Sequence, residues 1–171
     1  MFDAWGSLTS DAAKASILRG QALFNTKPIS ISGVAGVNDV AGIPVIAGTC
    51  ATCHNAPNIG TQSLGATMNI GTADSTSPLD LRYLPVITLR NTATGEIIQT
   101  TDPGRALVTG KWQDIGKVKV PGLRALSMHA PYFHNGSAKT LSDTVTFYDL
   151  RFNMGLTNQE KIDLVNFLNA L

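Results

Sequence analysis

The feature that most constrains this chain is its only pair of cysteines, which is followed directly by a histidine. The run reads Cys50-Ala51-Thr52-Cys53-His54. Two thiols three residues apart on a turn of helix can each form a thioether with one vinyl group of a haem, and the next residue can direct its imidazole at the iron. The motif therefore predicts one covalently attached haem c, bound by Cys50 and Cys53, with His54 as an iron ligand.

Other uses of a Cys-x-x-Cys pair fit this sequence less well. A zinc site needs about four ligands, but the chain has no third cysteine, and its two other histidines are distant in sequence. A redox-active dithiol would follow a strand in a βαβ unit, which the sequence pattern does not show. Because bacterial haem ligation takes place outside the cytoplasmic membrane, the motif also predicts a periplasmic or otherwise extracytoplasmic protein.

Composition excludes several further classes of function. The chain has 171 residues, 13 of them basic and 12 acidic, which suits one domain with a net charge of +1. This balance provides no basic surface for nucleic acid or anionic membranes, and no apolar run is long enough to span a bilayer. No signal peptide is recognisable. Residues 1–10 are interpreted as an N-terminal extension or a cloned start, and residues 11–171 as a mono-haem domain.

Local patterns predict a mainly α fold with long loops. Helices are expected over residues 11–24, 140–152 and 157–171, the last opening on a Thr157-to-Glu160 capping box. The first helix should bury Ala13, Ile17, Leu18 and Ala22, and the last Ile162, Val165, Phe167, Leu168 and Leu171. Residues 26–49 are rich in glycine and proline among β-branched residues and should form a loop with a short hairpin, and residues 55–110 should be loop-like for the same reason. A short β-hairpin is expected where residues 84–91 meet residues 96–100.

Three segments of the C-terminal half carry a resemblance to a known family. They contain the runs Asp102-Pro103-Gly104-Arg105, Val118-Lys119-Val120-Pro121 and Ala130-Pro131-Tyr132-Phe133-His134-Asn135-Gly136-Ser137. With the haem motif and a Gly20-x-x-Leu23-Phe24 helix, they resemble the C-terminal haem domain of the bacterial di-haem cytochrome c peroxidase and MauG family. The resemblance implies a cytochrome c-like domain over nearly the whole chain.

The resemblance also has implications for function. Family members carry two haems on two domains, and peroxide reacts at the N-terminal haem, whereas this chain has one attachment motif. It is therefore expected to transfer electrons, as a carrier or as the relay domain of a larger redox protein. Its partner would be a redox protein or an adjoining domain. The alternative is a peroxidase-like or MauG-like haem enzyme with a tyrosine-ligated or open distal site.

The second axial ligand is the least constrained part of the predicted site. In the family it lies fourteen residues after the histidine of the Pro-Tyr-Phe-His run, as methionine in the peroxidases and tyrosine in MauG, and that count leads from His134 to Tyr148. A methionine would raise the reduction potential, and a phenolate would lower it. The open alternatives are Met154, Met128, Met68, His129, His134 and a vacant position.

Two smaller expectations concern charges around the haem. Its propionates need cationic or N–H donors. The candidates within or beside the family-like segments are Arg105, Lys111, Trp112 and Arg124. The family also binds calcium between its two domains, but the second domain is missing here and His129 occupies a nearby position, so no calcium is expected.

Overall fold

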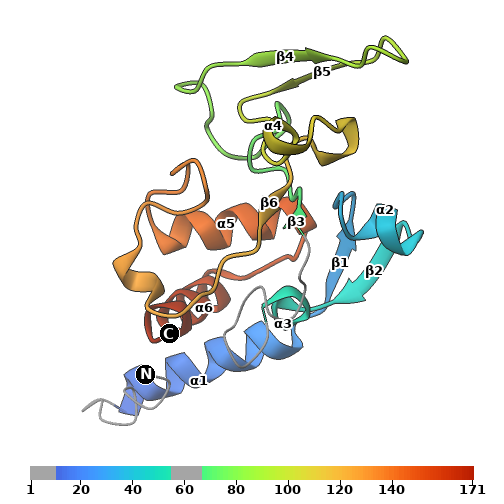
Figure 1. Ribbon diagram of the computed structural model, residues 1–171. Helices are drawn as coiled ribbons and strands as arrows, with labels where there is room; N and C mark the ends of the chain where they lie inside the picture. Colours follow the sequence, from blue (N-terminus) through green and yellow to red (C-terminus); the bar gives the residue numbers. More distant parts are fainter. Residues whose placement is uncertain (1–10, 55–66) are drawn as a thin grey trace.

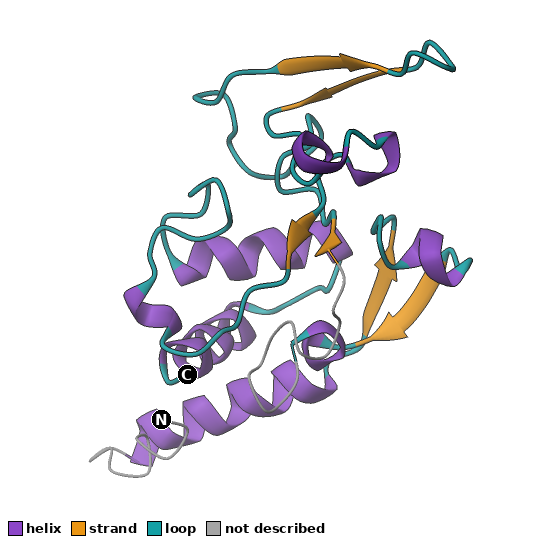
Figure 2. Cartoon of the chain, in the orientation of Figure 1, coloured by secondary structure: helices purple, strands orange, loops and turns teal. Residues whose placement is uncertain are grey.

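The computed structural model describes residues 11–54 and 67–171, so the predicted extension over residues 1–10 lies outside the described residues. The described chain is largely helical with long loops, as predicted (Figure 2). Its α-helices are α1 (Asp11–Thr26), α2 (Asn38–Ala41), α3 (Cys50–Cys53), α4 (Ala106–Thr109), α5 (Leu141–Phe152) and α6 (Asn158–Asn169), with 3₁₀ turns at Trp112–Asp114 and Leu126–Met128.

Short antiparallel strand pairs connect these helices. The strands are β1 (Ile29–Ser32) with β2 (Val45–Gly48), β3 (Thr67–Met68) with β6 (Val118–Lys119), and β4 (Ile87–Arg90) with β5 (Ile97–Thr100). The hairpin predicted from residues 84–100 is therefore confirmed. The β3–β6 pair was not predicted, because two residues per strand leave no detectable alternation in the sequence.

The two terminal helices pack side by side, with α1 lying against α6 (Figure 1). At Gly20, any Cβ would lie only 2.7 Å from the Cβ of Phe167 and closer still to the backbone of Asp163. Glycine is therefore what lets the two helix backbones approach each other. The aromatic rings of Phe24 and Phe167 pack beside this crossing, with their centroids 5.3 Å apart.

The predicted buried face of α1 was partly wrong. Leu18 is 48% exposed and Ala22 is also exposed, whereas Ser16, Ile17, Gly20 and Phe24 are buried. Counting apolar side chains missed the true face, because a glycine at the helix crossing and a serine bonded across it mark that face. The Oγ of Ser16 donates a hydrogen bond to Asp163 Oδ1 at 2.6 Å.

The C-terminal helix α6 shows a related shift. Thr157 caps it, accepting the N–H of Glu160, as the capping box predicted. Its predicted stripe held for Phe167, Leu168 and Leu171, but Ile162 is 53% exposed and Leu164 is buried in the stripe. The polar residue Asp163 is 2% exposed on this inner face, where Arg19 donates to both of its carboxylate oxygens at 2.7 and 2.8 Å.

A separate layer formed by α4, β4, β5 and the loops around them lies above the helices (Figure 1). At the lower edge of this layer, the buried hydroxyl of Thr100 donates a hydrogen bond to the carbonyl oxygen of Ala73 at 3.1 Å. The indole N–H of Trp112 donates to Glu96 at 3.1 Å and ties the 3₁₀ turn to the hairpin. This layer accounts for much of the glycine-rich region that was expected to be loop.

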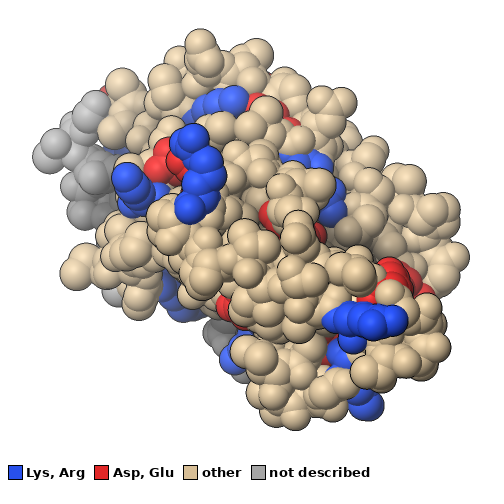
Figure 3. Space-filling view, turned by 90° about the horizontal axis from the view of Figure 1, so that it is seen from above, with Lys and Arg blue, Asp and Glu red and all other residues tan. Residues whose placement is uncertain are grey.

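Charged side chains are sparse, and both signs are mixed, on the face of the molecule that is seen from above. Lys and Arg side chains lie interspersed with Asp and Glu, and most of the face is uncharged (Figure 3). Within the described residues, no helix combines the length and apolarity needed to cross a bilayer.

Candidate functional site

An apolar cavity of about 560 Å³ lies between the terminal helices, the strands around β1 and helix α5. Its walls come from segments that are far apart in the sequence. The apolar side chains include Phe24, Ile31, Val34, Val120, Val145 and Leu168. A cavity of this size is within the range that holds small organic ligands and cofactors in proteins.

The cysteine–histidine motif forms one wall of this cavity. Cys50, Cys53 and His54 all line it, and the motif coincides with the short helix α3. The backbone N–H of Thr49 donates to the Oγ1 of Thr52 at 2.8 Å, which fixes the start of that helix. The His54 ring lies near Phe24, with centroids 6.5 Å apart.

Burial changes the acidity of both thiols. It raises the pKa of Cys50 to about 11, and it also raises the pKa of Cys53. Both thiols are therefore protonated and uncharged at neutral pH, as suits side chains in an apolar wall. Thiols used as nucleophiles at neutral pH have lowered pKa values instead.

Helix α5 brings Tyr148 to the same cavity. The Tyr148 ring packs among Phe133, Phe147 and Phe152, with centroid distances of 6.2, 5.4 and 6.2 Å. Burial raises the pKa of the Tyr148 phenol, and negative charge on Cys50 and Cys53 would raise it further. The phenol and the two thiols thus face a shared space, although almost a hundred residues separate them in sequence.

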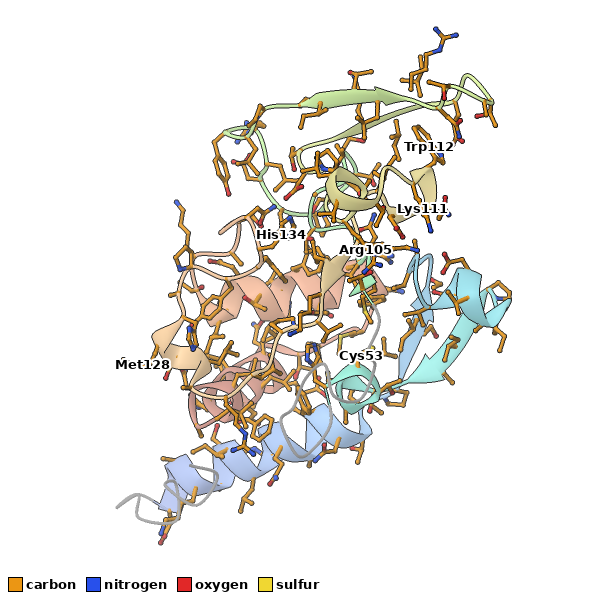
Figure 4. The ribbon with its side chains drawn as sticks, viewed as in Figure 1. Cys53, Arg105, Lys111, Trp112, Met128 and His134 are labelled. Carbon is orange, nitrogen blue, oxygen red and sulfur yellow. The ribbon has the colours of Figure 1, made fainter. Side chains whose placement is uncertain are left out.

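Most other candidates for the second axial position also line the cavity. Met68, Met154, His129 and His134 do so. Met128 does not: its side chain is 82% exposed on the outer side of the loop before α5 (Figure 4). This removes Met128 from the set of candidates.

The structure does not bring the four predicted propionate donors to the cavity. Neither Arg105, Lys111, Trp112 nor Arg124 is among its lining residues. Lys111 and Trp112 belong to the upper layer beside the hairpin (Figure 4), and Arg105 pairs with Asp114 at 3.4 Å. Proximity in sequence to the family-like runs was a poor guide to position.

Two basic residues within those runs do line the cavity. They are Lys119 in β6 and His134, and the Nε2 of His134 lies 3.2 Å from the Oδ2 of Asp102. The Asp102–His134 pair therefore joins two of the runs in space. Lys119 belongs to the middle run but was not predicted as a donor. The alternation of Val118, Lys119 and Val120 would place Lys119 on the face opposite the two valines, so no signal for this position was present in the sequence.

Comparison with known proteins finds bacterial cytochrome c peroxidases among the relatives of this chain, although no family model matches it. The chain is 31% identical over 99% of its length to cytochrome c peroxidase IdrP1 of Denitromonas iodatirespirans. It is 34% identical over 72% of its length to IdrP2 of the same organism, and 35% identical over 71% to cytochrome c peroxidase Ccp of Escherichia coli strain K12.

The chain spans less than half the length of these curated relatives: 44% of IdrP1, 36% of IdrP2 and 22% of Ccp. The matches nonetheless confirm the resemblance found in the sequence. This chain is a homologue of the bacterial cytochrome c peroxidases and resembles a haem domain of that family.

Proposed function

We propose that this chain binds one haem c in the apolar cavity and transfers electrons through it. Cys50 and Cys53 would hold it by thioether bonds, and His54 would bind the iron. One observation carries the proposal: all three residues of the attachment motif line a single apolar cavity of about 560 Å³. When bound, a haem supplies one-electron chemistry at its iron.

The donor set and the walls fit this cofactor. A porphyrin needs a largely apolar environment, which the side chains from α1, β1, α5 and α6 provide. The two uncharged thiols and the imidazole lie on one short segment in the Cys-x-x-Cys-His order of a haem c attachment motif. Among the basic residues on the described wall, we propose Lys119 and His134 as donors to the propionates, because both belong to the family-like runs.

We propose Tyr148 as the second iron ligand. It lies on a cavity wall formed by a different helix from the motif, and three phenylalanine rings restrict its movement. Met68, Met154, His129 and His134 remain the alternatives. A phenolate ligand stabilises ferric iron and lowers the reduction potential, whereas a methionine thioether raises it.

A peroxidase-like or MauG-like enzyme is the second candidate, and the position of Tyr148 on the cavity wall favours it. Cleavage of a peroxide bond also calls for a base close to the iron. On the described walls, the histidines other than His54 are His129 and His134, and His134 is paired with Asp102. Electron transfer needs no such base and is therefore preferred.

Compartment and partners are inferred from the same site. Haem c attachment implies a periplasmic or otherwise extracytoplasmic protein. The partner is proposed to be a redox protein or an adjoining domain, because the relatives are more than twice as long as this chain. The mixed, sparse charge in Figure 3 favours contact through uncharged surface over electrostatic steering.

The proposal is tested by producing the protein in a bacterium with an active haem c maturation system. Covalent haem is expected to stay with the chain on a denaturing gel, and any Cys50→Ala/Cys53→Ala chain that accumulates should lack it. Haem that leaves the wild-type chain on denaturation would refute covalent attachment. A pyridine haemochrome assay should give one haem per chain.

Absorption spectra of the ferric and reduced protein then identify the second ligand. A tyrosinate charge-transfer band that disappears in Tyr148→Phe supports Tyr148. The weak far-red band of a sulfur–iron bond would assign a methionine instead. Rapid formation of an oxidised product on adding peroxide would favour the enzyme over the electron carrier.

A further inference from the structure

We infer that Arg151 is a positioning residue that holds two walls of the cavity at a fixed spacing and so restricts access of external ligands to the iron. This inference rests on the proposed haem site. Arg151 lies in the last turn of α5, one turn beyond Tyr148. Its Nε donates to the carbonyl of Ile70 at 2.9 Å, and its Nη2 donates to the carbonyls of Ser32 and Gly33 at 3.1 and 3.0 Å.

These three bonds connect segments that each contribute to the cavity. On the α5 side, Val145, Tyr148 and Phe152 line it. On the other side, the lining residues are Ile31, Val34, Met68 and Ile70. The C-terminal end of α5 lies beside β3 in Figure 1, where one arginine can reach both segments. A single side chain thus joins three parts of the wall that are far apart in sequence.

The local structure is suited to a guanidinium in particular. Its planar group carries five N–H donors and stays charged at all relevant pH values, so it can serve several carbonyls at once. Its Cζ lies 4.8 Å from the ring centroid of Phe152, a residue of the cavity wall. Gly71 has a φ of +90°, and a Cβ there would lie 3.3 Å from the Arg151 Nε. Glycine therefore leaves room for the group.

These contacts have a consequence for ligand binding. With Tyr148 as the second iron ligand, an external ligand such as imidazole has to take its place. Outward movement of the α5 wall, which carries Tyr148, would make room for it and would break the Arg151 bonds. Hydrogen bonds to a charged donor resist such a movement more strongly than neutral ones. Without them, the open arrangement is more populated, and the apparent affinity for the ligand rises in proportion.

The test is an imidazole titration of the ferric, haem-loaded protein, followed by visible absorption. Arg151→Gln is expected to bind imidazole about tenfold more tightly than the wild type, as one lost charged hydrogen bond would allow. Arg151→Lys should be intermediate, because an ammonium cannot reach three carbonyls in the same fixed geometry. If Arg151→Gln does not accumulate, Arg151→Lys is judged by the same criterion.

Arg19→Gln is the matched control. Arg19 also makes two charged hydrogen bonds, both to Asp163, but these join α1 to α6 and do not connect the α5 wall to the segments around β1 and β3. This variant should lose stability and keep the imidazole affinity of the wild type. Equal affinities in the wild type and the Arg151 variants, or an equal rise in Arg19→Gln, would overturn the inference. Such a result would leave the haem site intact, whereas absence of haem on the denaturing gel would refute the site itself.

Discussion

The close approach of α1 and α6 at Gly20 gives the sharpest stability prediction. In Gly20→Ala, the new Cβ would lie 2.7 Å from the Cβ of Phe167 and closer to the backbone of Asp163. The Asp163 carbonyl belongs to a helix and cannot rotate away as a side chain could. The two helices must therefore move apart before these atoms reach ordinary contact distances.

Two opposing effects set the size of the change. Alanine is favoured over glycine within a helix by about 1 kcal/mol. Forcing an extra carbon into a packed interface costs about 1–3 kcal/mol, and here the separation also weakens the Phe24–Phe167 ring contact, a pair of the kind worth about 0.5–1.5 kcal/mol. The Arg19–Asp163 pair stretches as well. Overall we expect a loss of about 2–3 kcal/mol in the free energy of unfolding.

The assay is thermal unfolding followed by far-ultraviolet circular dichroism. For a chain of this size, about 2–3 kcal/mol corresponds to a fall in Tm of roughly 4–12 °C. Ala15→Gly, the reverse exchange at an exposed position of the same helix, is the control; it measures helix propensity alone and should cost about 1 kcal/mol. If Gly20→Ala were as stable as the wild type, or more stable, helix propensity would outweigh packing, and the close-approach argument would be wrong.

Three further predictions concern the ion pair, the motif and the axial ligand. Hydrogen bonding, above all from Arg19, lowers the pKa of Asp163 to about 2; the unfolded chain therefore binds more protons between about pH 4 and 2, and stability should fall over that range. In a pH series of urea unfolding, the advantage of the wild type over Asp163→Asn should be full above pH 4 and should shrink towards pH 2. A constant gap would contradict the assignment. The Cys50→Ala/Cys53→Ala variant should be unfolded or degraded, because the walls of a cavity of about 560 Å³ would lose their filling group; a native circular dichroism spectrum would argue against this. Tyr148→Phe should raise the midpoint potential measured by redox titration, whereas Met154→Leu should leave it unchanged if Tyr148 is the ligand.

The sequence predicted the elements whose signals are local. The capping box that opens at Thr157 correctly predicted the start of α6, because such a cap is formed by residues three positions apart. The hairpin followed in the same way from two β-branched runs around a turn. The buried faces of α1 and α6 were only partly predictable. There a glycine and an aspartate occupy positions that a count of apolar residues assigns to the surface.

The same distinction explains which parts of the candidate site could be predicted. The motif residues lie together because they are close in sequence. Tyr148 lines the same cavity, and only the spacing known from the family pointed to it in the sequence. Arg105 and Lys111 lie near family-like runs but belong to the upper layer, whereas Lys119 reaches the wall. Which basic residue meets the cavity depends on how β3 pairs with β6, and these two-residue strands leave no pattern in the sequence. Arg151 depends on three carbonyls from distant loops. Only the assembled fold could therefore reveal which charged residues lie on and around the cavity wall.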